Sequence, residues 1–163
     1  MLGYLWTKVR RFVRGAHGRK RFNVLGAINP FTLTMIYESN DGYVNSKTVC
    51  NLLRQIKKRG FKSPVTLVMD NARYQRCHLV QDLAESLDIG LLFLPSYSPN
   101  LNLIERYWKY LKGQLFRCRS IEKFDIFCTS IAAILGDRSA KRKEELVTLL
   151  APNFQVFDEA VIC

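Results

Sequence analysis

The chain has 163 residues, of which 48% are hydrophobic, and it carries a formal net charge of +11. That length suffices for one compact domain with a buried core, and the hydrophobic content is too high for an intrinsically disordered chain. No apolar run approaches the roughly 18 residues of a membrane span, and the short apolar start, 1–6, lacks the features of a signal peptide. We therefore expect a single domain over residues 1–163.

The positive charge is concentrated at the start of the chain. Positions 1–37 hold no acid, and the first acid is Glu38. A basic face of this kind suits a polyanion, most simply DNA or RNA, although it could also be a solvated strand surface. The seven basic residues are Lys8, Arg10, Arg11, Arg14, Arg19, Lys20 and Arg21.

The five cysteines form no Cys-x-x-Cys pair, and their number is odd. Neither a disulfide framework nor a zinc site is indicated, so we expect reduced thiols in a cytoplasmic protein. His17 and His78 have no metal-ligand spacing, and a structural or solvated role suits each better than catalysis.

Aromatic and β-branched residues predict a strand over 3–13, and the turn residues of 15–18 follow it. Further strands are predicted over 21–29 and 32–39, and the three strands together are expected to form an antiparallel meander. Next, 46–59 is predicted to be a helix capped by Ser46 and ended by Gly60. Its inner face comprises Val49, Leu52, Leu53 and Ile56.

The apolar run 65–69 predicts a short strand that is buried on both faces, as in a parallel sheet. A helix over 75–87 and a strand over 90–94 follow, and further helices are predicted over 103–115, 121–135 and 140–150. The inner face predicted for the 75–87 helix comprises Leu79, Val80, Leu83, Ala84 and Leu87; that of the 103–115 helix comprises Ile104, Tyr107, Trp108, Leu111 and Leu115. The element order indicates an α/β domain with added C-terminal helices.

Two carboxylates are the candidate chemical groups. Asp70 directly follows the 65–69 strand, where functional groups gather in open α/β sheets. Glu105 lies 35 positions later (105 minus 70), with Lys109 and Lys112 on the same face of its helix. Carboxylates bind Mg²⁺ and lysines bind a DNA backbone, so these residues suit a phosphate-cutting metal site.

Both carboxylates also have structural interpretations. Asp70 and Asn71 could simply begin a turn. Asn102 and Glu105 have the spacing of a capping box, with Asn102 as the N-cap residue. These alternatives stay open on residue types alone.

Two stretches resemble the catalytic domain of DDE transposases, in particular the bacterial insertion-sequence branch of the mariner superfamily. They are Leu67-Val68-Met69-Asp70-Asn71-Ala72-Arg73 and the segment 94–108, which contains Pro-Ser-Tyr-Ser-Pro and Ile104-Glu105. The segments 3–6 and 18–27 resemble earlier strands of the same family. Leu103 stands where many relatives have proline, but leucine also suits a first helical turn.

The resemblance implies a ribonuclease H-like fold, a mixed sheet flanked by helices, with Asp70 as the second catalytic Asp and Glu105 as the catalytic Glu. With a first Asp, these would bind two Mg²⁺ or Mn²⁺ ions for phosphodiester cleavage and strand transfer. Asn71 and Asn102 would support the site. DNA would contact Arg10, Arg14, Arg19, Lys20, Arg21, Arg73, Lys109 and Lys112.

The important departure is the family's first Asp, which lies on a strand upstream of the segment matching 3–6. No acid precedes Glu38, and Asp41 sits in a predicted turn. We therefore expect the first strand of the fold and the preceding DNA-end-recognition domain to be missing, through truncation, an internal start or a frameshift. An upstream-encoded transposase segment is a possible partner.

The expected function is metal-dependent DNA transposition in the bacterial cytoplasm, at the nucleoid. Its expected partners are the element ends, target DNA and a second copy of the chain in a homodimer. Without the first Asp, this chain should be inactive alone. Two alternatives remain, namely a non-catalytic DNA-binding or dimerising remnant and a structure-specific nuclease of similar fold.

Overall fold

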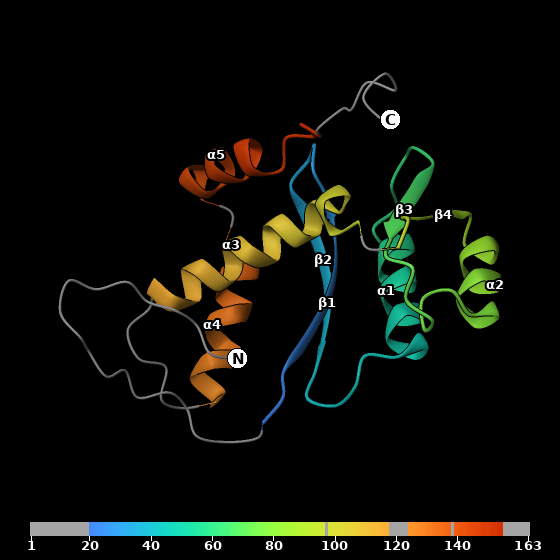
Figure 1. The fold of residues 1–163 in the computed structure, drawn as a ribbon, viewed down its shortest axis with the longest axis horizontal. Helices are drawn as coiled ribbons and strands as arrows, with labels where there is room; N and C mark the ends of the chain where they lie inside the picture. The colour runs from blue at the N-terminus through green and yellow to red at the C-terminus, as the bar shows by residue number, and fades with distance from the viewer. Residues whose placement is uncertain (1–19, 97, 118–123, 138, 155–163) are drawn as a thin grey trace, which may run out of the picture.

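The computed structural model describes residues 20–96, 98–117, 124–137 and 139–154 (Figure 1). Two pairs of strands and five α-helices make up this part of the chain. In order they are β1 (Asn23–Asn29), β2 (Thr34–Asn40), α1 (Ser46–Lys58), β3 (Val65–Met69), α2 (His78–Ser86), β4 (Ile89–Phe93), a 3₁₀ turn (Pro99–Leu101), α3 (Leu103–Arg117), α4 (Phe124–Gly136) and α5 (Ala140–Leu149). None of the described helices combines the length and the apolar character needed to cross a membrane.

The strands form two separate two-stranded sheets within the described residues. β1 and β2 pair antiparallel, from Asn23 opposite Asn40 to Asn29 opposite Thr34. β3 and β4 pair parallel, from Val65 opposite Ile89 to Met69 opposite Phe93. The antiparallel pairing of β1 with β2 and the parallel character of β3 are thus confirmed, while the strand predicted over 3–13 and the turn at 15–18 lie outside the described residues.

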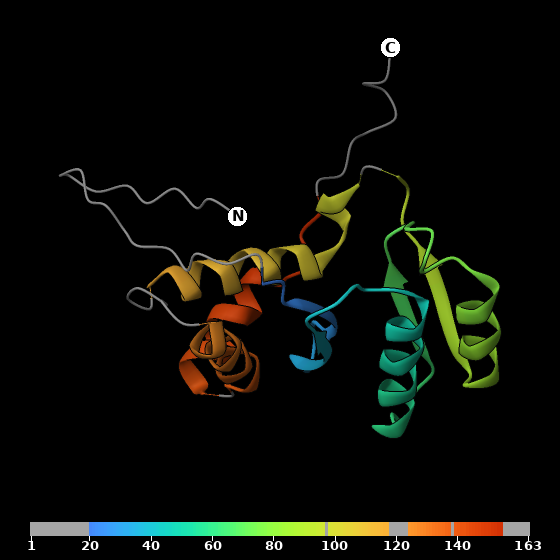
Figure 2. The ribbon, with the colours of Figure 1, turned by 90° about the horizontal axis from the view of Figure 1, so that it is seen from below.

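Side chains of β1 alternate between two hydrophobic clusters, as a half-buried strand requires. Leu25 and Ala27 pack toward the cluster built around α1. Val24 and Ile28 pack toward the cluster formed by α3, α4 and α5. The β1–β2 pair therefore lies between two helical layers, with α1 on one side and α3 with α4 on the other (Figure 2).

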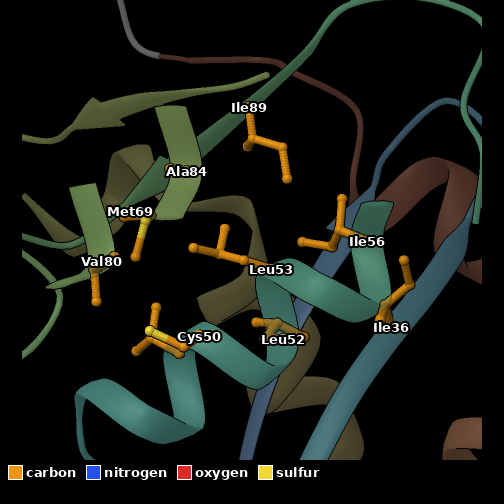
Figure 3. Packing of buried hydrophobic residues seen from close by; sticks show 10 residues of the cluster. Ile36, Cys50, Leu52, Leu53, Ile56, Met69, Val80, Ala84 and Ile89 are labelled. Carbon is orange, nitrogen blue, oxygen red and sulfur yellow. The ribbon is translucent and has the colours of Figure 1, made fainter. Parts of the chain in front are cut away.

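The first core lies between α1, α2 and the inner faces of the strands (Figure 3). Leu53 is fully buried at its centre, and the inner face predicted for α1 is confirmed: Val49, Leu52, Leu53 and Ile56 are all buried. In α2, Val80 and Ala84 are buried, but Leu79 is 53% exposed, so its predicted inward position is wrong. α2 begins at His78 rather than at the predicted residue 75. Leu83 and Leu87 are partly buried and pack against the core, as predicted.

The prediction that β3 is buried on both faces is wrong. Val65, Leu67 and Met69 face the core, whereas Thr66 and Val68 are exposed. Val68, which is 44% exposed, pairs with Leu92, which is 53% exposed. The reason is that the hydrophobic cluster of α1 and α2 covers one face of β3–β4, while the helices of the second cluster pack against β1–β2 instead.

The start of α1 is fixed by Asn45, not by the predicted Ser46. The Asn45 side chain accepts a hydrogen bond from the Thr48 backbone N–H at 3.1 Å, and the Asn45 backbone N–H donates to the Thr48 hydroxyl oxygen at 3.4 Å. Both residue types can cap a helix, and here the reciprocal contact with Thr48 selects the asparagine. At the other end Gly60 adopts a φ of +64°, which ends α1 as predicted.

A buried arginine joins the C-terminal helices. Arg142 of α5 lies 3.4 Å from Asp137 through its Nη1 atom and sits over the Tyr110 ring of α3. Asp137 also accepts a hydrogen bond from the Ser139 backbone N–H at 2.9 Å. That bond, and after it the contact with Arg142, lowers the pKa of Asp137 below its ordinary value. These contacts hold α5 against α3.

Candidate active site

Asp70 lies at the carboxyl end of β3, where the sequence placed it. Its strand and β4 run parallel, so both end at the same edge, and the Leu94 N–H extends the ladder by bonding the Met69 carbonyl at 2.9 Å. The chain leaves the sheet directly after Met69, and Asp70 is exposed. Its carboxylate is therefore presented at an edge of the sheet rather than being packed into the core.

Asn102 connects Asp70 to the start of α3. It is only 8% exposed, and its Nδ2 atom donates a hydrogen bond to Oδ1 of Asp70 at 2.8 Å. Its Oδ1 atom accepts a hydrogen bond from the backbone N–H of Ile104 at 3.3 Å. One buried amide therefore binds the loop after β3 and the first turn of α3 at once.

Glu105 lies in that first turn of α3, three residues after Asn102, and is exposed. Its backbone N–H donates to the Asn102 carbonyl at 3.1 Å. Asn102 caps α3 through the Ile104 N–H, but neither of the two reciprocal bonds of a capping box with Glu105 is present. Among the described residues, no side chain or backbone group forms a hydrogen bond with the Glu105 carboxylate. The group is thus available to a ligand.

Further contacts hold the loop after Asp70. Arg76 donates from Nη1 to Oδ1 of Asn71 at 3.0 Å, and its guanidinium lies over the Phe93 ring of β4. Arg73 is exposed, as a DNA contact requires. The sequence reasoning missed Arg76, and the spacing of five positions from Asn71 is too general a signal to have found it.

The other predicted DNA contacts fall into three groups. Lys109 and Lys112 are exposed on α3 on the same face as Glu105. Lys20 lies over the Phe124 ring at 5.2 Å, and Arg21 lies over the Tyr43 ring at 4.6 Å, so both cations also have intramolecular partners. The remaining three, Arg10, Arg14 and Arg19, are outside the described residues.

The donor set fits a divalent cation in part. Two exposed carboxylates, Asp70 and Glu105, stand on segments that Asn102 joins, and carboxylate oxygens are the ligands that Mg²⁺ prefers. Within the described ranges, no group of three or more His, Cys, Asp or Glu side chains is close enough to hold a metal ion. Both carboxylates are suitable ligands for a divalent cation, but two carboxylates alone would bind it only weakly.

Comparison with known proteins points in one direction. The family model of the DDE superfamily endonuclease matches residues 7–128, well over half of the chain. A search of the curated proteins found no match.

Among solved structures, the catalytic domain of Mos1 mariner transposase matches with a TM-score of 0.61 and 16% identity, over 89% of this chain and 80% of that one. Mos1 transposase catalytic domain with Raltegravir and Mg matches with a TM-score of 0.48 and 18% identity, over 74% of this chain and 71% of that one. A Mos1 transposase paired-end complex with left transposon end matches with a TM-score of 0.47 and 17% identity, over 95% of this chain and 52% of that one. The first likeness establishes the fold, a mixed α/β architecture of the ribonuclease H-like kind.

Proposed function

The chain belongs to the DDE superfamily endonuclease family, and on that premise we propose that it is the catalytic part of a DNA transposase. Its reaction would be metal-dependent cleavage of a phosphodiester at the element ends, followed by strand transfer to target DNA. The observation that carries the proposal is the hydrogen bond from Asn102 to Asp70, because it joins the end of β3 to the helical turn that bears Glu105.

In this proposal Asp70 and Glu105 hold Mg²⁺ or Mn²⁺, which when bound would activate the attacking oxygen and stabilise the leaving one. Asn102 is a positioning residue: its amide N–H fixes Oδ1 of Asp70, a side chain that is otherwise exposed. Lys109 and Lys112 bind the phosphates beside the site, since they share an exposed helix face with Glu105.

Two carboxylates are fewer than two-metal chemistry needs, so we propose that a third comes from an upstream-encoded transposase segment. Support comes from the separation of the described strands into two small sheets, which leaves β1 and β3 each with one strand neighbour. An added strand that carries an Asp could pair with these edges and complete both the sheet and the site.

We expect metal binding to depend on the two carboxylates. Mn²⁺ titration followed by electron paramagnetic resonance should show weak binding to the chain. The double variant Asp70→Asn/Glu105→Gln should weaken it by more than about tenfold, since it removes both charged ligands. The matched control is Asp82→Asn/Glu85→Gln, which neutralises two exposed acids on α2. Equal affinity in the site variant and the control would contradict the proposed site.

Cleavage should require the third carboxylate. The chain alone, with Mg²⁺ and a supercoiled plasmid, should nick DNA only at the background rate. Co-expression with the upstream-encoded segment should give nicking that is lost with Asp70→Asn and also when the Asp of that segment is replaced by Asn. Efficient Mg²⁺-dependent nicking by the chain alone, abolished by Asp70→Asn, would contradict the need for a partner segment.

A second candidate is a DNA-binding or dimerising protein without chemistry. It is favoured by one observation, the lack of any three-acid group in the described residues. DNA binding that weakens with salt, is unchanged by Asp70→Asn and Glu105→Gln, and gives no cleavage even with the added segment would support this candidate against the first.

A further inference from the structure

Charge is segregated between the two neighbouring helices of the first core. From residue 42 to residue 69 the sequence has no Asp or Glu, while six basic residues fall on or just after α1: Lys47, Arg54, Lys57, Lys58, Arg59 and Lys62. From residue 77 to residue 105 it has no Lys or Arg, while Asp82, Glu85 and Asp88 fall on or just after α2. The charged residues of α1 are therefore positive, and those of the neighbouring α2 are negative.

The positive side is an ordered stripe. Lys47, Asn51, Arg54 and Lys58 recur every three or four residues, so they line one face of α1, and all four are exposed. Lys47 and Lys58 are eleven positions apart, so the stripe extends about 16 Å along the helix. The opposite face of the helix is held in the core by Leu53 and its neighbours. Its charges are thus displayed on a rigid surface.

Neighbouring acids do not neutralise these cations. Across the residues that the structure describes, the one ion pair recorded is that of Arg142 with Asp137. Glu38, the carboxylate nearest to α1 along β2, accepts its hydrogen bond from the uncharged Gln55 at 2.8 Å. Arg54 donates from Nη1 to Oδ1 of Asn51 at 3.2 Å, which keeps its guanidinium along the stripe.

Helix stability explains only part of this pattern. Lys57 and Lys58 lie in the last turn of α1, where cations favourably oppose the partial negative charge of the helix end. Lys47 lies in the first turn, where a cation is unfavourable, and no acid is present there to offset it. A purely structural role therefore accounts for one end of the stripe and not for the other.

We propose that the outer face of α1 is a second DNA-binding surface, which holds the phosphate backbone of duplex DNA outside the cleavage site. This proposal deepens the proposed function and shares its DNA partner. Six residues join the end of α1 to the start of β3, so the Lys58 end lies at the edge of the sheet remote from Asp70. DNA bound along the stripe would lead away from the site, and the acids of α2 would repel it from the other flank.

The test uses the full chain with Asp70→Asn and no divalent metal, so that its outcome does not depend on catalysis. Binding of a 30-base-pair duplex is measured by fluorescence anisotropy across a salt series. Arg54→Gln/Lys58→Gln should weaken binding to unrelated sequences alike and reduce the slope of log affinity against log salt by about 2, one for each phosphate contact. The control, Lys141→Gln/Lys143→Gln, removes two exposed lysines of α5 and should change the slope little.

If both double variants reduce the slope of log affinity against log salt equally, binding responds to net charge alone and the proposal is overturned. If neither variant reduces the slope, the proposal is also overturned. Thermal unfolding of the two variants confirms that each is folded. The stripe could instead bind the acidic α2 of a second copy of the chain. Analytical sedimentation without DNA tests this alternative, because it measures whether the chain forms a dimer. A dimer that Arg54→Gln/Lys58→Gln dissociates, with an unchanged DNA slope, would also overturn the proposal.

Discussion

Leu53→Ala should destabilise the protein by about 3–5 kcal/mol. Leu53 lies at the centre of the first core, is fully buried, and packs where α1 meets α2 and the strands. Its removal leaves a cavity among side chains from several elements, because these cannot all move inward without losing their own contacts. The loss is a large share of the total stability that a domain of this size normally has.

The measurement is urea denaturation followed by circular dichroism, with the midpoint compared at a constant denaturant slope. The control is Leu79→Ala, which makes the same chemical change on α2 at a side chain that is 53% exposed, and its effect should stay below about 1 kcal/mol. A loss of similar size in both variants would show that the first core is not centred on Leu53.

Sequence periodicity predicted the elements whose environment is set locally. The buried face of α1 follows from helical spacing, and the boundaries of β3, Val65–Met69, follow from an apolar run between breakers. Periodicity could not show which face of a strand is covered by another element. Val68 and Leu92 have the residue types of a buried strand, but they are exposed because the helices of the second cluster pack on the other sheet.

The site was predictable only in part for a similar reason. Asp70 follows from its strand, and Glu105 follows from the helix that contains it. Their connection depends on the hydrogen bond of Asn102 to Asp70, which spans 32 positions and follows from no local rule. The capping-box spacing gave Asn102 a local role, and the structure adds the long-range one. The acid-free interval from 42 to 69 is visible in the sequence, but its exposure as one stripe on α1 is shown only by the structure.

Asn102→Asp should destabilise the protein by about 2–4 kcal/mol near neutral pH, although the two side chains have nearly the same shape. The change removes the N–H group that bonds Asp70 at 2.8 Å and places a second carboxylate against it in a site that is only 8% exposed. Burial and the charge of Asp70 both raise the pKa of the introduced carboxyl group above its unfolded value of roughly 3.9.

The sign of the pH dependence follows from that direction. A raised pKa in the folded state means that the folded variant binds the proton more tightly than the unfolded one, so the penalty is fully present above the folded pKa. It decreases as pH falls and is smallest below the unfolded pKa, where the introduced group is neutral and can donate a hydrogen bond to Asp70. Urea denaturation at about pH 7.5 and pH 4, each compared with the unmodified chain at the same pH, measures this difference.

Asn51→Asp provides the matched control, because it makes the same substitution at an exposed position on α1 and keeps an acceptor for Arg54. Its effect should stay within about 0.5 kcal/mol at both pH values. If Asn102→Asp destabilises equally at both pH values, the loss reflects packing, and the amide does not fix the Asp70 carboxylate. If the penalty decreases toward low pH only at position 102, the buried amide is what holds Asp70 in place beside the turn that bears Glu105.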